Sequence, residues 1–195
     1  MPATPRTFSV AFTLALPALA LGMDFDESVM GDLSGDETMP TSLGALAEGT
    51  TTVSGSTIAL PVDAEFFSFE ILPGTELGSI VLADYTGPLG GGSFIALTAG
   101  VGFTSLFDPN DYLGTALVGT QTGALVGDDI LDDLNDRAFG GQGFSQPLGP
   151  GEYTIWYQET AGATDYSFAL NVIPAPGAAV LLGGAGVFAM RRRRA

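Results

Sequence analysis

The 195-residue sequence contains no cysteine, no histidine and no lysine. Without cysteine and histidine the chain cannot form disulfide bonds, use a thiol or an imidazole in catalysis, or build the zinc sites that need these side chains. None of its serines lies in a Gly-x-Ser-x-Gly motif, and none has a histidine partner. A carboxylate pair of a glycoside hydrolase is an alternative, but 22 acidic residues form such pairs by chance. The sequence therefore predicts a protein that is not an enzyme and needs no cofactor, with the exception of a candidate Ca²⁺ ion.

Basic residues are scarce, and they lie almost entirely at the two ends of the chain. Arg6 is near the N-terminus, four arginines precede the last residue, and Arg137 alone lies among the acidic residues. All 22 acidic residues fall within residues 24–165, and the whole chain has a net charge of −16. Because like charges repel, this composition predicts no binding to nucleic acid or to anionic lipid.

The first 20 residues are typical of a secretory signal peptide. Arg6 precedes an apolar run over residues 8–21, and Ala18 and Ala20 form the kind of site that signal peptidase cleaves. We expect cleavage after Ala20, with Gly22 as the alternative position. An uncleaved membrane anchor is the other interpretation, which the shortness of the run disfavours, since a span needs about 20 residues.

Residues 174–195 form a C-terminal segment in three parts. Pro174, Ala175 and Pro176 precede 14 uncharged residues, and the chain then carries Arg191, Arg192, Arg193 and Arg194. As a helix, 14 residues span about 21 Å, which is less than the hydrocarbon core of about 30 Å. Because polybasic ends stay on the cytoplasmic side, we expect this segment to insert into the membrane transiently after the preceding chain has crossed.

This three-part arrangement resembles the C-terminal sorting signal of PEP-CTERM proteins. The resemblance implies that an exosortase, a membrane-embedded cysteine transpeptidase, recognises and removes the tail. The sequence departs from the usual family pattern at Ala175, where glutamate commonly stands between the two prolines. A plain single-span anchor with a positive-inside flank is the alternative.

The region between the terminal segments shows the two-residue period of β-strands. Alternating apolar faces recur in three segments: Phe67, Phe69 and Ile71; Tyr153, Ile155 and Tyr157; and Tyr166, Phe168, Leu170 and Val172. Glycine and proline clusters at residues 73–74, 87–92 and 149–151 separate such segments. We predict an all-β fold, an antiparallel and jelly-roll-like β-sandwich at residues 51–173, preceded by an acidic leader and first strand region at 21–50. An N-terminal signal-peptide helix and a short C-terminal hydrophobic helix would flank it.

Two further predictions concern side chains of this region. Apolar residues occupy both alternations of residues 77–85, which predicts a strand buried on both sides. Trp156 lies on the face opposite Tyr153, Ile155 and Tyr157. We expect Trp156 to pack in a core, and an aromatic platform for a ligand is the alternative.

Much of the same region resembles the bacterial pre-peptidase C-terminal type domain. The matching passages are Gly31 to Asp36, Asp63 to Phe69, Gly151 to Thr160 and Asp165 to Phe168. That family consists of jelly-roll-like accessory modules of exported proteins. The resemblance therefore implies a fold and an exported setting, and no particular activity.

The densest group of acidic side chains is a candidate Ca²⁺ site. It comprises Asp128, Asp129, Asp132, Asp133 and Asp136. On a helix the first, third and fifth of these line up, and Ca²⁺ favours several carboxylate oxygens in irregular geometry. The alternative is a short amphipathic helix that buries Ile130, Leu131 and Leu134 and begins with aspartates that favour its dipole.

A second acidic group occupies residues 24–37. Its spacing suggests a calcium loop, but Val29 and Gly35 stand where an EF-hand requires glycine and glutamate. We therefore interpret this segment as a flexible acidic leader.

Together these features predict an exported protein of the cell envelope, cell surface or extracellular matrix, made as a membrane-anchored precursor. We expect a structural or adhesive role, with extracellular polysaccharide as a candidate partner. A Ca²⁺-dependent carbohydrate-binding module of β-sandwich type is the alternative function.

Overall fold

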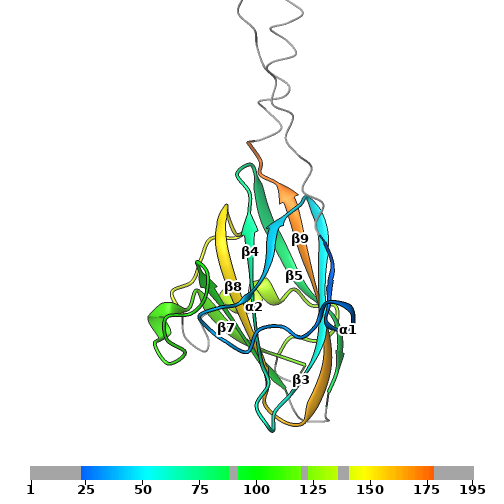
Figure 1. The fold of residues 1–195 in the computed structure, drawn as a ribbon. Helices are drawn as coiled ribbons and strands as arrows, with labels where there is room; N and C mark the ends of the chain where they lie inside the picture. The colour runs from blue at the N-terminus through cyan, green and yellow to red at the C-terminus, as the bar shows by residue number, and fades with distance from the viewer. Residues whose placement is uncertain (1–22, 88–91, 120–122, 136–140, 178–195) are drawn as a thin grey trace, which may run out of the picture.

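Two packed β-sheets make up the protein (Figure 1). The computed structural model describes residues 23–87, 92–119, 123–135 and 141–177. The first sheet has the order β1 (Phe25–Asp26), β3 (Gly49–Ile58), β9 (Ala163–Pro174) and β5 (Thr75–Thr86). The second has the order β2 (Thr41–Leu46), β4 (Ala64–Ile71), β8 (Gly151–Glu159), β6 (Ser93–Ala99) and β7 (Gly114–Val118). The short helices are α1 (Glu27–Met30), the 3₁₀ turn η1 (Pro109–Asp111) and α2 (Ile130–Asn135).

The predicted all-β sandwich is confirmed, with one difference in strand direction. β1 pairs with β3 in parallel, and β2 pairs with β4 in parallel, whereas the other pairs of named strands are antiparallel. β2 lies in the predicted first strand region of residues 21–50, whereas β1 lies in residues 24–37, interpreted above as a flexible leader. That interpretation is wrong, because Phe25 and Leu33 are buried in the main core. Residues 23–50 cross from one sheet to the other and supply an edge strand to each.

The main core lies between the inner faces of the two sheets. All three alternating faces expected from the sequence are buried there, on β4, β8 and β9 respectively. Tyr157 packs edge-on against Phe168 with a ring separation of 5.0 Å, so the two sheets meet through aromatic contacts. The period-two pattern therefore identified the inner face of these strands correctly.

β5 differs from the prediction of a strand buried on both sides. Its register with β9 shifts between Leu77 and Ser79, and such a bulge turns the residues that follow it to the opposite face. Leu77, Ile80 and Leu82 consequently share the inner face although their positions do not alternate regularly. The other side of β5 is only partly covered, since Val81 is half-buried and Ala83 is exposed. Apolar residues occupy both alternations of this strand because of the bulge.

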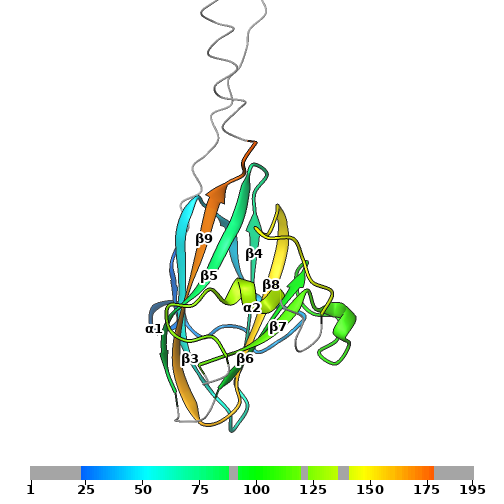
Figure 2. The same cartoon turned by 180° about the vertical axis from the view of Figure 1, so that it is seen from behind.

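α2 closes one open side of the sandwich. It lies against β5 and β7, which are the edge strands of the two sheets on that side (Figure 2). Ile130, Leu131 and Leu134 are fully buried, as the amphipathic pattern predicted. The helix thus supplies the apolar cover that neither edge strand provides for itself.

Trp156 belongs to a second, smaller core on the outer face of the five-stranded sheet. Its ring stacks on Phe66 at a centroid distance of 5.8 Å and meets Phe94 and Phe103 edge-on. Residues 100–113 cover this face, and Phe103 and Tyr112 from that segment are buried. The expectation that Trp156 packs in a core is confirmed.

Replacing Phe103 by alanine should expose the single tryptophan to water. Phe103 is 2% exposed, so we expect the folded protein to lose about 3 kcal/mol and the Trp156 emission to move to longer wavelength. The cost is smaller than at the main core because this outer layer can relax into the space. Phe107→Ala is the matched control, because Phe107 is 94% exposed on the same segment. Equal spectra for both variants would contradict this packing role.

Within the described residues, no helix is both long and apolar enough to cross a membrane. The predicted signal-peptide helix at residues 1–20 and the predicted hydrophobic helix that follows residue 177 lie outside the described ranges.

Candidate functional site

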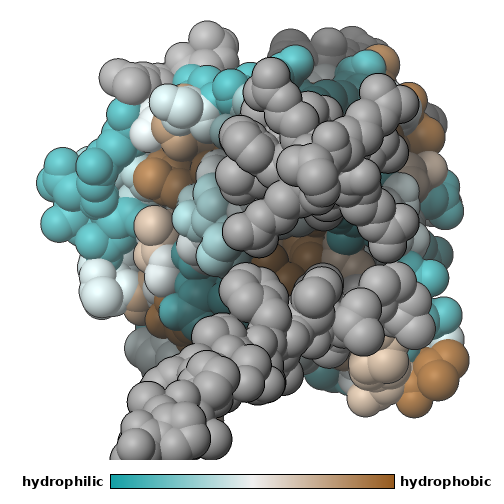
Figure 3. Space-filling model, turned by 90° about the horizontal axis from the view of Figure 1, so that it is seen from above, coloured by the Kyte–Doolittle hydropathy of each residue, from teal (hydrophilic) through white to brown (hydrophobic). Residues whose placement is uncertain are grey.

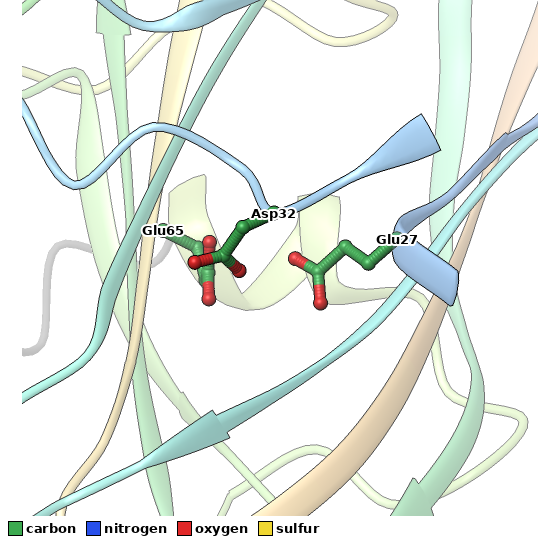
Figure 4. Close-up of side chains that lie close together, drawn as sticks. All are labelled: Glu27, Asp32 and Glu65. Carbon is green, nitrogen blue, oxygen red and sulfur yellow. The ribbon is translucent and has the colours of Figure 1, made fainter. Parts of the chain in front are cut away.

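Three carboxylates from separate parts of the chain converge at one place (Figure 4). They belong to Glu27 on α1, Asp32 in the turn after it, and Glu65 on β4. One oxygen from each lies within 4.8 Å of the others, which is close enough for a single metal ion to contact all three. Among the described residues, this is the group of acidic side chains that gathers in this way.

Glu65 reaches the site because it points into the sandwich. It has the same strand parity as Phe67, Phe69 and Ile71, whose side chains form the inner face of β4. The side chain is 0% exposed, and neither of its carboxylate oxygens has a hydrogen-bond partner. An ionised carboxylate in such a place is costly unless a positive charge compensates it.

Glu27 is held over the edge of the four-stranded sheet. Asp26 caps α1 by accepting a hydrogen bond from the Ser28 N–H at 2.9 Å, and this fixes the first turn. The Glu27 carboxylate then accepts hydrogen bonds from the Ser56 N–H at 2.8 Å and the Tyr166 hydroxyl at 3.1 Å. Gly55 leaves the space for it, because a Cβ there would lie 2.1 Å from Glu27 Oε2. Glycine in β3 therefore has a local reason, namely close approach of a carboxylate.

Asp32 follows a sharp turn that brings the chain back toward β4. Gly31 ends α1 with φ of 93°, a conformation that side chains disfavour, and its N–H donates to the Glu27 carbonyl. Buried Leu33 then anchors the segment, and the Phe66 N–H donates to the Ser34 carbonyl at 2.8 Å. Asp32 itself is exposed, so the site has one ligand in the core and one in solvent.

Among the described residues, no positively charged side chain balances the three carboxylates. The described ranges contain none of the six arginines, and the sequence has no lysine or histidine. Burial raises the pKa of Glu65 to about 9, with further contributions from the charges of Glu27, Asp63 and Asp32. Burial also raises the pKa of Glu27, against hydrogen bonds that lower it. This geometry therefore favours a bound proton or a bound cation at the Glu65 carboxylate.

A second buried carboxylate differs from that of Glu65 because hydrogen-bond donors surround it. Glu159 is also fully buried, yet it accepts hydrogen bonds from five groups. Burial alone would raise its pKa, but hydrogen bonds from Thr164, Ala161, Ser93 and Thr160 hold that pKa below its usual range. Glu65, in contrast, has both of its carboxylate oxygens buried without a hydrogen-bond partner.

Glu27 and Asp32 also line an open pocket of about 580 Å³. Its other acidic lining residues are Asp26, Asp84 and Asp165. Solvent ions thus reach the exposed side of the three carboxylates through a strongly negative surface, which concentrates cations.

The aspartates of residues 128–136 are arranged differently from the prediction. α2 begins at Ile130, so Asp128 precedes the helix, and Asp136 lies outside the described residues. Asp129 accepts hydrogen bonds from the Ile80 N–H and the Leu131 N–H, which are structural contacts at the helix start. Asp132 and Asp133 are exposed on the helix. None of the four described aspartates joins a three-carboxylate group, and a Ca²⁺ site that includes Asp136 stays a prediction.

Of the predicted sorting signal, only the first part is described. Pro174 is the last residue of β9, and the Ala175 N–H donates to the Gly74 carbonyl at 2.9 Å. Pro176 follows at the end of the sandwich, whereas Arg191, Arg192, Arg193 and Arg194 lie outside the described residues.

The acidic spacing of residues 24–37 was visible in the sequence, but Glu65 was not identified from it. The signal for Glu65 was present in the alternation of β4, since an acid with the parity of three buried apolar residues must point inward. No protein-family model, curated protein or solved structure matches this chain.

Proposed function

We propose that the protein is an exported, non-enzymatic β-sandwich of the cell surface or extracellular matrix, with a structural or adhesive role. The observation that carries this proposal is the position of the two predicted transit segments relative to the fold. They flank the sandwich in sequence, and within the described residues they share only Pro174 with a strand, since β1 begins at Phe25 and β9 ends at Pro174.

Both ends of the described chain lie at the same end of the sandwich (Figure 1). Asp24 accepts a hydrogen bond from the Thr52 N–H near the start of β3, and the start of β3 pairs with the end of β9. Viewed from this end, the described surface carries hydrophilic residues interspersed with smaller hydrophobic areas (Figure 3). A membrane-anchored precursor would thus hold the sandwich by one end and leave its long sides free.

The processing partners follow from the same proposal. Signal peptidase would act after Ala20, and an exosortase-type transpeptidase would act at Pro174, Ala175 and Pro176 while the tail is briefly in the membrane. The free sides of an acidic body, without lysine, would then face other matrix components such as extracellular polysaccharide. Electrostatic repulsion between such acidic sandwiches would keep them dispersed until they are attached to the matrix.

A chain that ends at Pro176 should be exported but not retained. This truncation keeps all of β9 and the Ala175 contact, so we expect an intact sandwich that is released into the medium, whereas the full chain stays with the cells. Fractionation followed by mass spectrometry of both termini measures the distribution and the cleavage sites. Arg137→Gln is the matched control, because it removes an arginine outside the tail.

Equal retention of the truncated and full chains would contradict the sorting role of the tail. Recovery of the intact full chain from the cytosol, with both terminal segments attached, would contradict export altogether.

A further inference from the structure

We propose that Glu27, Asp32 and Glu65 bind one Ca²⁺ ion, and that this ion ties the N-terminal segment to both sheets. The donor set consists only of carboxylate oxygens, which are the ligands that hard divalent cations prefer. This inference does not depend on export or on the C-terminal tail.

The buried end of the site is the strongest support for an ion. Glu65 is fully buried, both its oxygens lack a hydrogen-bond partner, and it points toward the other two carboxylates (Figure 4). Glu159 shows that this fold satisfies a buried carboxylate with donors when no cation is needed. At Glu65 both oxygens instead lack a donor and two further carboxylates lie within 4.8 Å, an arrangement that a shared cation stabilises and that is repulsive without one.

The remaining geometry favours Ca²⁺ over smaller or softer ions. Glu27 and Asp32 face the open pocket of about 580 Å³, so solvent can complete the six to eight oxygen ligands that Ca²⁺ takes. Mg²⁺ demands near-ideal octahedral geometry, which side chains from a helix, a turn and a strand do not preset. Zinc, copper, iron and nickel favour imidazole or thiolate ligands, and the sequence has neither.

Bound Ca²⁺ would connect three parts of the fold. Glu65 belongs to the five-stranded sheet, while Glu27 rests against Gly55 and Ser56 of the four-stranded sheet. Asp32 lies between them in the turn that leads from α1 to the second sheet. The ion would therefore cross-link the two sheets at the edge of the sandwich.

Titration of the full chain in mild detergent with Ca²⁺, followed by calorimetry and thermal unfolding, tests the proposal. We expect one saturable site per chain with a Kd on the order of 10⁻³ M or tighter, and a rise in Tm with Ca²⁺ concentration. Mg²⁺ should bind more weakly. Glu65→Gln should abolish both the heat and the rise in Tm while the protein stays folded, because glutamine is neutral and has nearly the shape of the glutamic acid side chain. Glu70→Gln is the matched control, since Glu70 is exposed on the opposite face of the same strand.

Gly55→Ala is the second variant, and it leaves all three ligands in place. Its Cβ would overlap the Glu27 carboxylate, which is the movable end of a side chain, so we expect weakened Ca²⁺ binding in a folded protein. Absence of saturable binding in the unmodified chain would overturn the proposal. So would one-to-one binding that persists unchanged in Glu65→Gln, which would assign the ion to other carboxylates, or binding of Mg²⁺ more tightly than Ca²⁺.

Discussion

Glu159→Gln should destabilise the protein by about 3 kcal/mol at neutral pH. The Glu159 carboxylate is buried and accepts five hydrogen bonds at once, from the backbone N–H groups of Thr160 and Ala161 and from three hydroxyls. The hydroxyl donors are Tyr85, Ser93 and Thr164. A glutamine amide has only one oxygen, and its NH₂ group would face donors. At least one buried donor would therefore lose its partner.

The same substitution should change how stability depends on pH. Hydrogen bonds hold the pKa of Glu159 below its ordinary value of 4.5, despite the opposing effect of burial. A lowered pKa in the folded state means that this stabilisation is fully present above the unfolded pKa and is lost as pH falls through the folded one. Urea unfolding between pH 7 and pH 3 should thus show a steeper acid decline for the unmodified protein than for Glu159→Gln.

Glu152→Gln controls for the loss of a carboxylate, because Glu152 is exposed on the same strand. Parallel pH profiles for the unmodified chain and Glu159→Gln would contradict this role of Glu159. So would equal destabilisation by the two glutamine variants.

Strands whose apolar residues alternate with polar ones could be predicted from the sequence, and a strand with an unbroken apolar run could not. β4, β8 and β9 follow the two-residue period because each has one face against the main core. β6 was not predicted, because the outer aromatic layer buries Ala96 while the main core buries Ile95 and Leu97. Its apolar residues therefore run together without alternation. The prediction for β5 was wrong for a related reason, since a bulge places residues of both parities on one face.

Part of the candidate site was visible in the local spacing of acidic residues, and the other part is brought close only by the fold. Glu27 and Asp32 lie five residues apart, and the acidic spacing around them was visible in the sequence. Glu65 joins them through pairing of the Ser34 and Phe66 backbones, a contact that no local pattern specifies. The aspartates near α2 looked more promising because they are adjacent in sequence, yet Asp129 is engaged at the start of that helix. Density of charge along the chain did not identify Glu65, whereas its inward parity on β4 would have.

Gly114→Ala should cost about 3 kcal/mol, since it forces two backbones apart. Gly114 begins β7 and is buried against α2, where an added Cβ would lie 1.6 Å from the Leu134 carbonyl oxygen. A carbonyl in a helix cannot swing aside as a side chain can, so α2 must move away from the sandwich. That movement would expose Ile130, Leu131 and Leu134, each of which contributes about 1.5 to 3 kcal/mol by its burial.

Chemical unfolding together with the binding of a hydrophobic dye measures this effect, because a displaced α2 uncovers the side of the core between β5 and β7. Gly149→Ala is the matched control, since no atom lies within 4 Å of a Cβ at that position. We expect the control to unfold like the unmodified protein and to bind no additional dye. Similar stability for Gly114→Ala and Gly149→Ala would mean that α2 does not rest on β7 at the distance described, and the closure of the sandwich by this helix would need to be revised.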